Sequence, residues 1–395
     1  MIDGIWRPTG VPAVYKLIEG FEERNIEIKL VFTCKDYEYH WKKTKDETLR
    51  IHGLKTKITV LAGGLFFTWG PRIIKGYLRE IRQTYLILKI FKTFKPDIIY
   101  FDRANFIPAA FFARFFSTRV VIRMMGVGTS FLRKAISGRN IKHFILRWAF
   151  RSPFSFVICT QDGSGAESWL HQILPTKVPR AFMFNGVDYN AKERTVNTNF
   201  ADLPKDRTIV LFVGRLEKLK GCEEFLEGFL FALKNDREHL HALIVGGGSL
   251  SGKLHQMVEE RCISNSVTFM GELPHDQIIG ALLRSDIYVS LNRGGNLSNT
   301  NLEAMRAGCC MIIPASQPDR GIDIVTDEMI PNDAVFRIPG PDDTVALSEA
   351  ILYFHRNKEE GVARGQAISE IAKSLIPSWD DRISKELNIL ESLIR

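Results

Sequence analysis

Short apolar runs alternate with helical patterns between residues 208 and 314, and no other feature restricts the fold as strongly. The apolar runs are TIVLFVG (208–214), HALIVGG (241–247), SVTFMG (266–271), IYVSL (287–291) and CMIIP (310–314), separated by helical patterns over 222–234, 254–263, 276–286 and 299–308. Strands joined through helices of this length run parallel, so the pattern predicts an α/β domain with helices on both faces of its sheet. Ligands of such sheets bind beyond the carboxyl ends of the strands.

The first half of the chain repeats the pattern less regularly. Expected strands cover 26–33, 96–102, 119–126 and 153–160, and helical stretches cover 12–24, 72–94 and 139–150. A chain of 395 residues with 45% hydrophobic content is long enough for two cores, so we expect two Rossmann-like domains with a boundary near 179–190. The apolar lead before PTGVP (8–12) is short, so either the first strand is truncated or Met1 lies downstream of the natural start.

Cysteine spacing and hydropathy restrict the compartment. The six cysteines show no C-x-x-C spacing, which argues against a zinc site or a disulfide framework and favours a reducing compartment. The chain opens without an apolar signal segment and contains no run of about twenty apolar residues, so neither secretion nor membrane spanning is predicted. We therefore expect a cytoplasmic protein.

Positive charge is concentrated in one region. Residues 71–151 hold seventeen Lys or Arg and three acids, a local charge of 17 − 3 = +14 in a chain whose formal net charge is +8. The same region holds fifteen aromatic residues, which favours an anionic membrane surface as a partner and the inner face of a membrane as the location. The alternative is an aromatic core under solvated lysines. Nucleic acid is not expected, because no RNA-recognition, helix-turn-helix or zinc-finger signature accompanies the charge.

Polar segments follow the strands of the predicted C-terminal sheet, and they should meet at one edge. Arg215 and Lys220 flank a tight turn from strand to helix, and the helix that begins near Asn299 offers free backbone N–H groups. Two cations and such donors form a site for a diphosphate. Glu303, one turn inside the helix, can accept hydrogen bonds from the hydroxyls of a neighbouring ribose. The alternatives are a glutamate favoured by the helix macrodipole and an Arg–Glu surface pair.

Four segments of the second half resemble the C-terminal domain of retaining glycosyltransferases with the GT-B fold, in the GT4 group (glycosyl transferases group 1). These segments are VGRLEKLKG (213–221), LIVGGG (243–248), FMGELPHDQI (269–278) and NLSNTNLEAMRAGC (296–309), and TGVP, ICTQDGSG, FNGVD and SWDDRI extend the resemblance over nearly the whole chain. It implies two Rossmann-like doubly wound domains facing across a cleft. They would be an N-terminal acceptor-binding domain (1–186), a C-terminal nucleotide-sugar-binding domain (187–377) and a C-terminal helix (378–395) that packs on the N-terminal domain.

The resemblance also implies roles for individual residues. Arg215 and Lys220 would hold the donor diphosphate and stabilise the leaving nucleotide, and Glu303, the second glutamate of an E-x7-E motif, would bind the donor ribose. The remaining contacts to the sugar and phosphates would come from the glycine loop at Gly10 and from backbone N–H groups around Leu297, Ser298 and Asn299.

The chain departs from the family pattern at two places. Gly295 stands where the first glutamate of E-x7-E is expected, and Asn296, Ser298 and Asn299 are expected to supply hydrogen-bond partners in its place. Relatives often carry a histidine at the N-domain positions that YFDRAN (100–105) and RMMG (123–126) occupy here. Asp102 is the expected catalytic substitute. The alternative is a solvated residue at a strand end.

The expected activity is transfer of a hexosyl or N-acetylhexosaminyl group from a UDP-, GDP- or ADP-sugar to a lipid-linked or polysaccharide acceptor. Polysaccharide and lipopolysaccharide biosynthesis are the expected settings. No D-x-D triplet occurs in the chain, so neither a bridging metal nor a cofactor is expected, and Arg215, Lys220 and helix N–H groups must meet the charge on the leaving diphosphate. Two alternatives remain open: a sugar-nucleotide epimerase of the GT-B fold, and a non-catalytic protein that binds nucleotide sugars.

Overall fold

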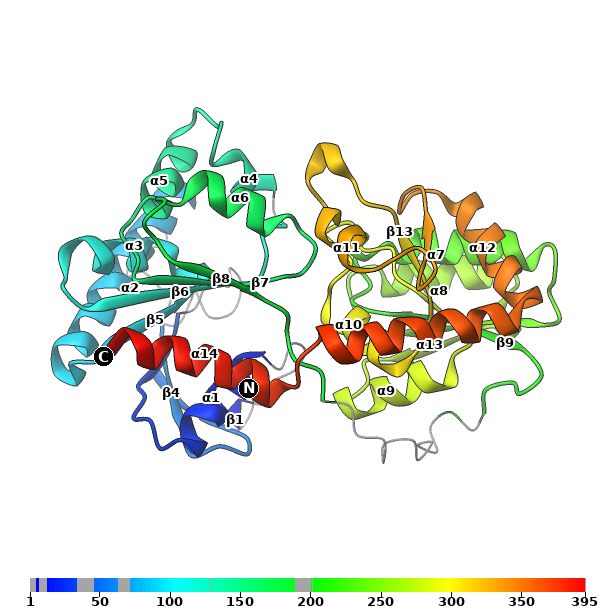
Figure 1. Ribbon diagram of the computed structural model, residues 1–395, viewed down its shortest axis with the longest axis horizontal. Helices are drawn as coiled ribbons and strands as arrows, with labels where there is room; N and C mark the ends of the chain where they lie inside the picture. Colours follow the sequence, from blue (N-terminus) through cyan, green and yellow to red (C-terminus); the bar gives the residue numbers. More distant parts are fainter. Residues whose placement is uncertain are drawn as a thin grey trace. The chain divides into compact units, whose positions relative to one another are not determined.

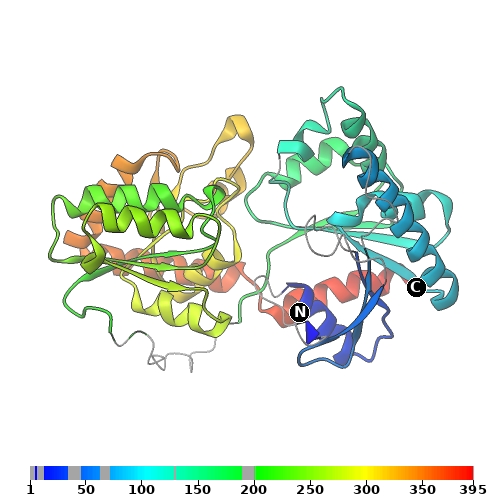
Figure 2. The ribbon, with the colours of Figure 1, turned by 180° about the vertical axis from the view of Figure 1, so that it is seen from behind.

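The structure, a computed structural model, describes residues 5–6, 13–33, 46–62, 72–128, 130–188, 200 and 202–394. The chain divides into two units, each of which is coloured by sequence in Figures 1 and 2. Unit 1 comprises Met1–Thr160, Glu167–Met183 and Asp380–Arg395, and unit 2 comprises Gln161–Ala166 and Phe184–Trp379.

Unit 2 is built on a six-stranded sheet in which every neighbouring pair is parallel. The strand order is β11-β10-β9-β12-β13-β14. The strands are β9 (Thr208–Val213), β10 (Leu240–Val245), β11 (Val267–Gly271), β12 (Ile287–Val289), β13 (Cys310–Pro314) and β14 (Phe336–Ile338). This is a doubly wound order, as the alternation of apolar runs and helices predicts.

Helices cover both faces of this sheet (Figures 1 and 2). They are α7 (Cys222–Leu233), α8 (Ser251–Glu260), α9 (His275–Arg284), α10 (Asn299–Ala307), α11 (Ile324–Met329), α12 (Thr344–Arg356) and α13 (Lys358–Leu375), with short 3-10 turns η4 (Lys218–Lys220), η5 (Ser264–Ser266) and η6 (Pro318–Arg320). Val210 and Phe212 of β9 belong to a buried cluster with α7, α8 and α12, whereas Ile209 and Leu211 belong to a second cluster with α9, α10 and α13. Alternate residues of one strand thus fill two cores.

Unit 1 contains a parallel sheet of order β5-β6-β7-β8 and a second, mixed sheet of order β1-β3-β4-β2. The strands are β1 (Ile5–Trp6), β2 (Leu30–Thr33), β3 (Glu47–Ile51), β4 (Lys57–Leu61), β5 (Ile98–Asp102), β6 (Arg119–Met124), β7 (Phe156–Thr160) and β8 (Arg180–Met183). We did not predict β3 and β4. They pair antiparallel across a short turn at Gly53, whose φ is 83°, because so short a connection cannot join parallel strands.

The helices of unit 1 include three that pack in a row, with α3 between α2 and α5 (Figure 1). The set is α1 (Ala13–Glu23), α2 (Arg72–Phe94), α3 (Phe106–Phe115), α4 (Ser130–Lys134), α5 (Ile141–Phe150) and α6 (Ala166–Ile173), with the 3-10 turn η1 (Arg103–Asn105). Aromatic rings join the row: Phe91 and Phe112 lie 5.4 Å apart, and Phe106 and Phe150 lie 3.8 Å apart, between ring centroids. Much of the aromatic content of this region is therefore core.

The last helix, α14 (Trp379–Ile394), belongs to unit 1 from Asp380 onward. Its buried residues Ile383, Leu387 and Leu390 form the apolar stripe expected from their spacing. Ile383 lies so close to α1 that a Cβ at Gly20 would come within 2.5 Å of its Cγ2. No helix in the described parts of the chain is both long and apolar enough to cross a membrane.

A buried ionic cluster also attaches α14 to β5 and β6. Glu386, which has no exposed surface, accepts hydrogen bonds from the Tyr100 hydroxyl and from Arg382, and Arg123 lies 3.6 Å from its carboxylate. Burial alone would raise the pKa of Glu386, but the guanidinium groups of Arg123 and Arg382 bring it below its ordinary value. Among the described residues, some buried N–H groups of both arginines have no acceptor. The negative charge of Glu386 therefore offsets part of the cost of burying the two guanidinium groups.

Candidate functional site

The strand order of unit 2 places its candidate site. The chain passes from β9 to β10 on one side of β9, whereas β12 pairs with the other side, so the segments that follow β9 and β12 leave the sheet as neighbours. Arg293 confirms that these segments touch, because its backbone N–H donates to the Leu219 carbonyl at 3.0 Å and its side chain donates to the Lys218 carbonyl at 3.2 Å. This reversal of strand order is where doubly wound sheets bind ligands.

The segment after β9 carries the two predicted cations. Arg215 is exposed and lies 3.2 Å from Glu217, while Lys220 is half-buried at the end of η4. Burial lowers the pKa of Lys220 and the nearby charge of Arg215 lowers it further, with Asp162 and Glu217 opposing this. The mutual repulsion shows that the two cations share one region of space. An anion placed between them would relieve it.

The segment after β12 leads into the N-terminus of α10. Ser298 precedes the helix and donates its hydroxyl to Asn301 Oδ1 at 3.1 Å, so it does not cap the backbone of the first turn. The Asn299 side chain accepts a hydrogen bond of 2.6 Å from Asn185. The first N–H groups of a helix have no acceptor within it, so those of α10 remain directed toward this edge of the sheet.

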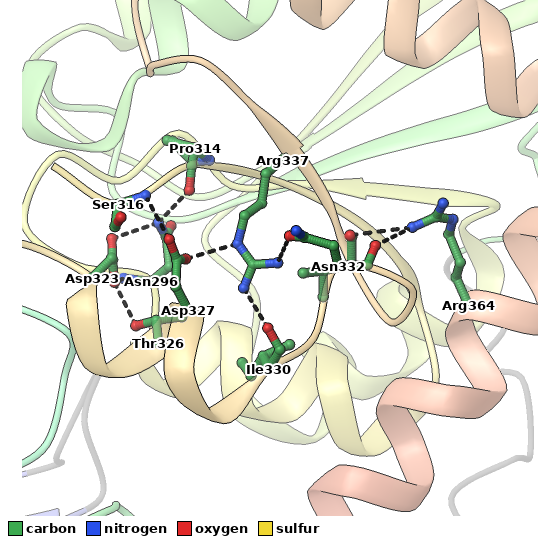
Figure 3. Close-up of polar contacts among 11 residues, drawn as sticks. Asn296, Pro314, Ser316, Asp323, Thr326, Asp327, Ile330, Asn332, Arg337 and Arg364 are labelled. Atoms are coloured by element: carbon green, nitrogen blue, oxygen red, sulfur yellow. Dashed lines mark hydrogen bonds and ion pairs between the residues drawn. The ribbon is translucent and has the colours of Figure 1, made fainter.

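Asn296 and Leu297, which the sequence analysis expects to contact the sugar and phosphates, make contacts within the protein. Asn296 is fully buried, and both its backbone N–H and its side-chain amide donate to the Asp323 carboxylate at 2.7 Å. Figure 3 shows this amide directed at Asp323, whose carboxylate also accepts from the Thr326 hydroxyl. The Leu297 N–H donates to the Asp162 carbonyl at 3.2 Å. Both residues therefore shape the loop, and among the described residues the donors left for a ligand begin at Ser298 and Asn299.

Asp323 holds this loop in place from the other side. Burial raises its pKa to about 6, although hydrogen bonds from Asn296 and Thr326 oppose the rise. A second set of contacts, also drawn in Figure 3, fixes the end of β13: Arg337 donates to Asp327 at 2.8 Å, and Asp327 accepts from the Ser316 N–H at 3.3 Å. The loop before α10 is therefore positioned by buried polar contacts on α11.

Glu303 lies inside α10, is buried, and bonds to Nε2 of the half-exposed His275 at 2.8 Å. His275 was not predicted as a site residue, although it belongs to the FMGELPHDQI segment that carried the resemblance. Its position as the first residue of α9, next to a buried carboxylate, is the signal that could have identified it. The pair joins α10 to the N-terminus of α9.

Two predicted site residues, Asp102 and Gly10, lie in the first half of the chain. Asp102 belongs to unit 1, at the end of β5, where its exposed carboxylate accepts the Ala104 N–H at 2.8 Å and caps η1. That contact gives Asp102 a local structural role. Gly10 lies outside the described residues. Among the residues that the structure describes, no group of His, Cys, Asp or Glu side chains could hold a metal ion.

Residues 161–166 contribute to unit 2 although the chain on both sides of them belongs to unit 1. Asp162 accepts the Leu297 N–H through its carbonyl, and Gly163 accepts the Asp323 N–H at 2.8 Å. Gly295 has a φ of 122°, and a Cβ there would lie 2.3 Å from the Asp162 carbonyl oxygen. Position 295 therefore cannot carry a side chain while this segment occupies its place.

The fold and the site together define a class. The solved structures similar to this chain include a sucrose-phosphate synthase from Thermosynechococcus elongatus, with a TM-score of 0.73 and 17% identity over 98% of this chain and 95% of that one. HepE of Anabaena, solved in complex with UDP, gives a TM-score of 0.65 and 15% identity over 98% and 99%. These likenesses confirm the predicted GT-B fold of two Rossmann-like domains.

Comparison of sequences gives a match over part of the chain. Residues 193–364 match the family model Glycosyl transferases group 1. An uncharacterized glycosyltransferase of Methanocaldococcus jannaschii is 31% identical over 122 residues, which cover 31% of this chain and 30% of that protein. The chain thus matches less than a third of the length of this curated relative. The family match and this relative support a glycosyltransferase.

Proposed function

We propose that this protein is a retaining, GT4-like glycosyltransferase that moves a sugar from a nucleotide-sugar donor to a lipid-linked or polysaccharide acceptor in cell-surface glycan biosynthesis. The observation that carries the proposal is the convergence of Arg215, Lys220 and the N-terminus of α10 at the reversal of strand order in unit 2. Two cations and a set of helix N–H groups suit a diphosphate. The UDP bound to HepE, a protein of the same fold, is consistent with such a ligand.

The same groups explain how transfer would proceed. The bond between C1 of the sugar and the β-phosphate oxygen breaks, and negative charge grows on the diphosphate. Arg215, Lys220 and the α10 N–H groups meet that charge in a partly desolvated site, where it stabilises the transition state most. A bond forms from the acceptor oxygen to C1 on the same face, and the departing phosphate oxygen takes the acceptor's proton. No protein carboxylate acts as nucleophile in this scheme.

A donor panel tests the proposal. The protein is incubated with radiolabelled UDP-glucose, UDP-N-acetylglucosamine, GDP-mannose or ADP-glucose and a membrane extract, and label in the lipid and polysaccharide fractions is counted. We expect one donor to label those fractions and to release its nucleoside diphosphate in equal amount. Conversion of a donor into its epimer would support the epimerase alternative. Binding of a donor without turnover would support the non-catalytic alternative.

Replacing Glu303 with Gln should weaken nucleotide binding. The charged acceptor for hydroxyl groups is lost, which is worth about 1.5 to 3 kcal/mol, or roughly a ten- to hundredfold increase in the dissociation constant of the donor. Calorimetric titration with the nucleoside diphosphate checks this. Glu259→Gln, at an exposed position of α8, is the matched control. An unchanged dissociation constant in Glu303→Gln would remove Glu303 from the ribose site.

The helices α2 and α5 carry exposed apolar side chains that suit a membrane in which a lipid-linked acceptor lies. Exposed apolar residues lie on one face of α2 and on one face of α5: Ile74, Leu78, Ile81 and Tyr85, and Ile141, Phe144 and Trp148. Cations accompany the rings, with Lys89 Nζ at 4.7 Å from the centroid of Tyr85 and Arg114 at 4.8 Å from that of Trp148. Exposed apolar side chains among cations suit an anionic lipid surface, so we assign peripheral binding on the inner face of a membrane.

Binding to vesicles should depend on the negative charge of the lipid. We expect cosedimentation with vesicles that contain anionic lipid, little with neutral ones, and release at high salt, because screening shortens to about 3 Å at 1 M. Changing the exposed Lys89, Lys92 and Lys95 to Glu should reduce this binding without affecting donor hydrolysis in solution. The control is the same change at three exposed lysines of unit 2, Lys205, Lys358 and Lys373. Equal loss in both triple variants, or equal binding to both kinds of vesicle, would contradict a docking surface on α2 to α5.

A further inference from the structure

Residue 295 has no room for a side chain because the backbone of residues 162–164 lies against it, and this segment carries the carboxylate of Asp162. A Cβ on Gly295 would meet only backbone atoms, at 2.3 Å from the Asp162 oxygen, 2.5 Å from the Gly163 carbonyl carbon and 2.7 Å from the Ser164 nitrogen. Backbone cannot move aside as a flexible side chain can. The segment 162–164 thus takes the space in which a residue 295 side chain would lie, and the first residue of that segment is an aspartate.

Close contacts hold this segment against the loop before α10. Gly163 has a φ of 83°, and a Cβ there would lie 2.3 Å from Asp323 Oδ1 and 2.9 Å from the Asn296 nitrogen. The Asp162 carbonyl accepts the Leu297 N–H at 3.2 Å, one residue before the free donors of α10 begin. The backbone of Asp162 is therefore fixed beside the N-terminus of that helix.

The Asp162 side chain is held by its own loop. One carboxylate oxygen accepts the Ser164 N–H at 3.0 Å, which fixes the orientation of the group. Burial raises the pKa of Asp162, while the Ser164 hydrogen bonds and the charge of Lys220 lower it, so the carboxylate and the Lys220 ammonium are electrostatic partners. Asp162 is thus half-buried, with its backbone beside the N-terminus of α10 and its carboxylate within electrostatic reach of Lys220, the cation that we assign to the diphosphate.

We propose that Asp162 determines specificity for the transferred sugar, with its carboxylate accepting hydrogen bonds from hydroxyls of the sugar that the nucleotide carries. This inference rests on the proposed function, because it assumes a nucleotide sugar at Arg215 and Lys220. On this proposal the carboxylate binds the sugar and not the nucleotide, since a negative charge would repel the phosphates. Binding of the sugar should therefore depend on Asp162, and binding of the nucleoside diphosphate should not.

The experiment compares ligands with and without the sugar. Kd is measured by calorimetry for UDP and UDP-glucose, GDP and GDP-mannose, and ADP and ADP-glucose, in the full chain and in Asp162→Asn, which keeps the oxygen that accepts from Ser164. For the pair that the wild type binds, we expect the nucleotide sugar to bind about ten- to a hundredfold more weakly in the variant, with the nucleoside diphosphate unchanged. Asp319→Asn, at an exposed position of unit 2, is the matched control and should change neither.

The possible results separate the two proposals. Equal weakening of the nucleoside diphosphate and of the nucleotide sugar in Asp162→Asn would overturn the inference, because the residue would then act only by positioning Lys220. Unchanged binding of both ligands would overturn it too. If the wild-type protein binds none of the three nucleoside diphosphates, the proposed function itself fails, and the inference fails with it. Melting curves of the two variants exclude a general loss of structure.

Discussion

Lys220→Ala and Arg215→Ala should each reduce the rate of sugar transfer by roughly a hundredfold, or about 3 kcal/mol of transition-state stabilisation. On the proposed assignment, each change removes a cation that would stabilise the charge on the leaving diphosphate. Because Arg215 is exposed and Lys220 is half-buried without an ion pair among the described residues, neither change should lower the melting temperature appreciably. Initial rates at saturating donor, with the donor that the panel identifies, give the measurement.

Lys218→Ala is the control for both variants. Lys218 lies in the same 3-10 turn, is exposed, and contributes its carbonyl, not its ammonium group, to the contact with Arg293. Its loss should leave the rate within about twofold, since surface charges contribute little. Near-normal turnover in Lys220→Ala or Arg215→Ala would show that the diphosphate lies elsewhere. A hundredfold loss in Lys218→Ala would show that the rate responds to charge at this edge in general.

Glu386→Ala should destabilise unit 1 by about 3 to 5 kcal/mol, because it leaves the buried guanidinium groups of Arg123 and Arg382 without a counter-charge. Hydrogen exchange resolves the effect, since amides of α14, β5 and β6 should exchange faster while those of β9 and β10 keep their protection. Glu391→Ala, at an exposed position of the same helix, should have no such effect. Unchanged exchange in α14 after the Glu386 change would show that the apolar stripe alone holds the helix.

The stability that the Glu386 carboxylate contributes should decrease as the pH falls. The pKa of Glu386 is lower in the folded chain than in the unfolded one, so the carboxylate stabilises the fold above its unfolded pKa and loses that contribution as the pH falls through the folded pKa. Acid should therefore reduce the protection of α14 in the wild type. In Glu386→Ala this part of the acid dependence should be absent.

Much of the fold could be predicted because local pattern and final burial agree. The strands β9 to β13 and the helix α2 lie within a few residues of their predicted positions, since each buries a face that the periodicity marks. The helix α3 was not predicted. Its sequence, FIPAAFFARF, is apolar on nearly every side because α2 and α5 cover it, so it lacks the amphipathic period of a surface helix. The strand β3 (ETLRI) is too polar to be distinguished from a loop, whereas β4 (KITVL) carries an apolar run that could have been recognised.

The residues of the candidate site also divide into those that the local sequence pattern predicts and those that it does not. Arg215, Lys220 and the N-terminus of α10 could be predicted because strand, turn and helix follow one another directly in the chain. The burial of Asn296 against Asp323 and the proximity of Asp162 to Lys220 could not. Each depends on residues far apart in sequence meeting through backbone contacts at glycines, and no local pattern records such contacts.

The insertion of residues 161–166 into unit 2 means that the two units cannot be separated by a single cut. The chain passes between them after Thr160, after Ala166, after Met183 and after Trp379. A fragment that began at Phe184 would lose the acceptors of the Leu297 and Asp323 N–H groups, and Gly295 would face empty space. Unit 2 would therefore be recovered intact only if the six residues 161–166 were supplied with it. Its recombination with an unrelated first half would be correspondingly difficult.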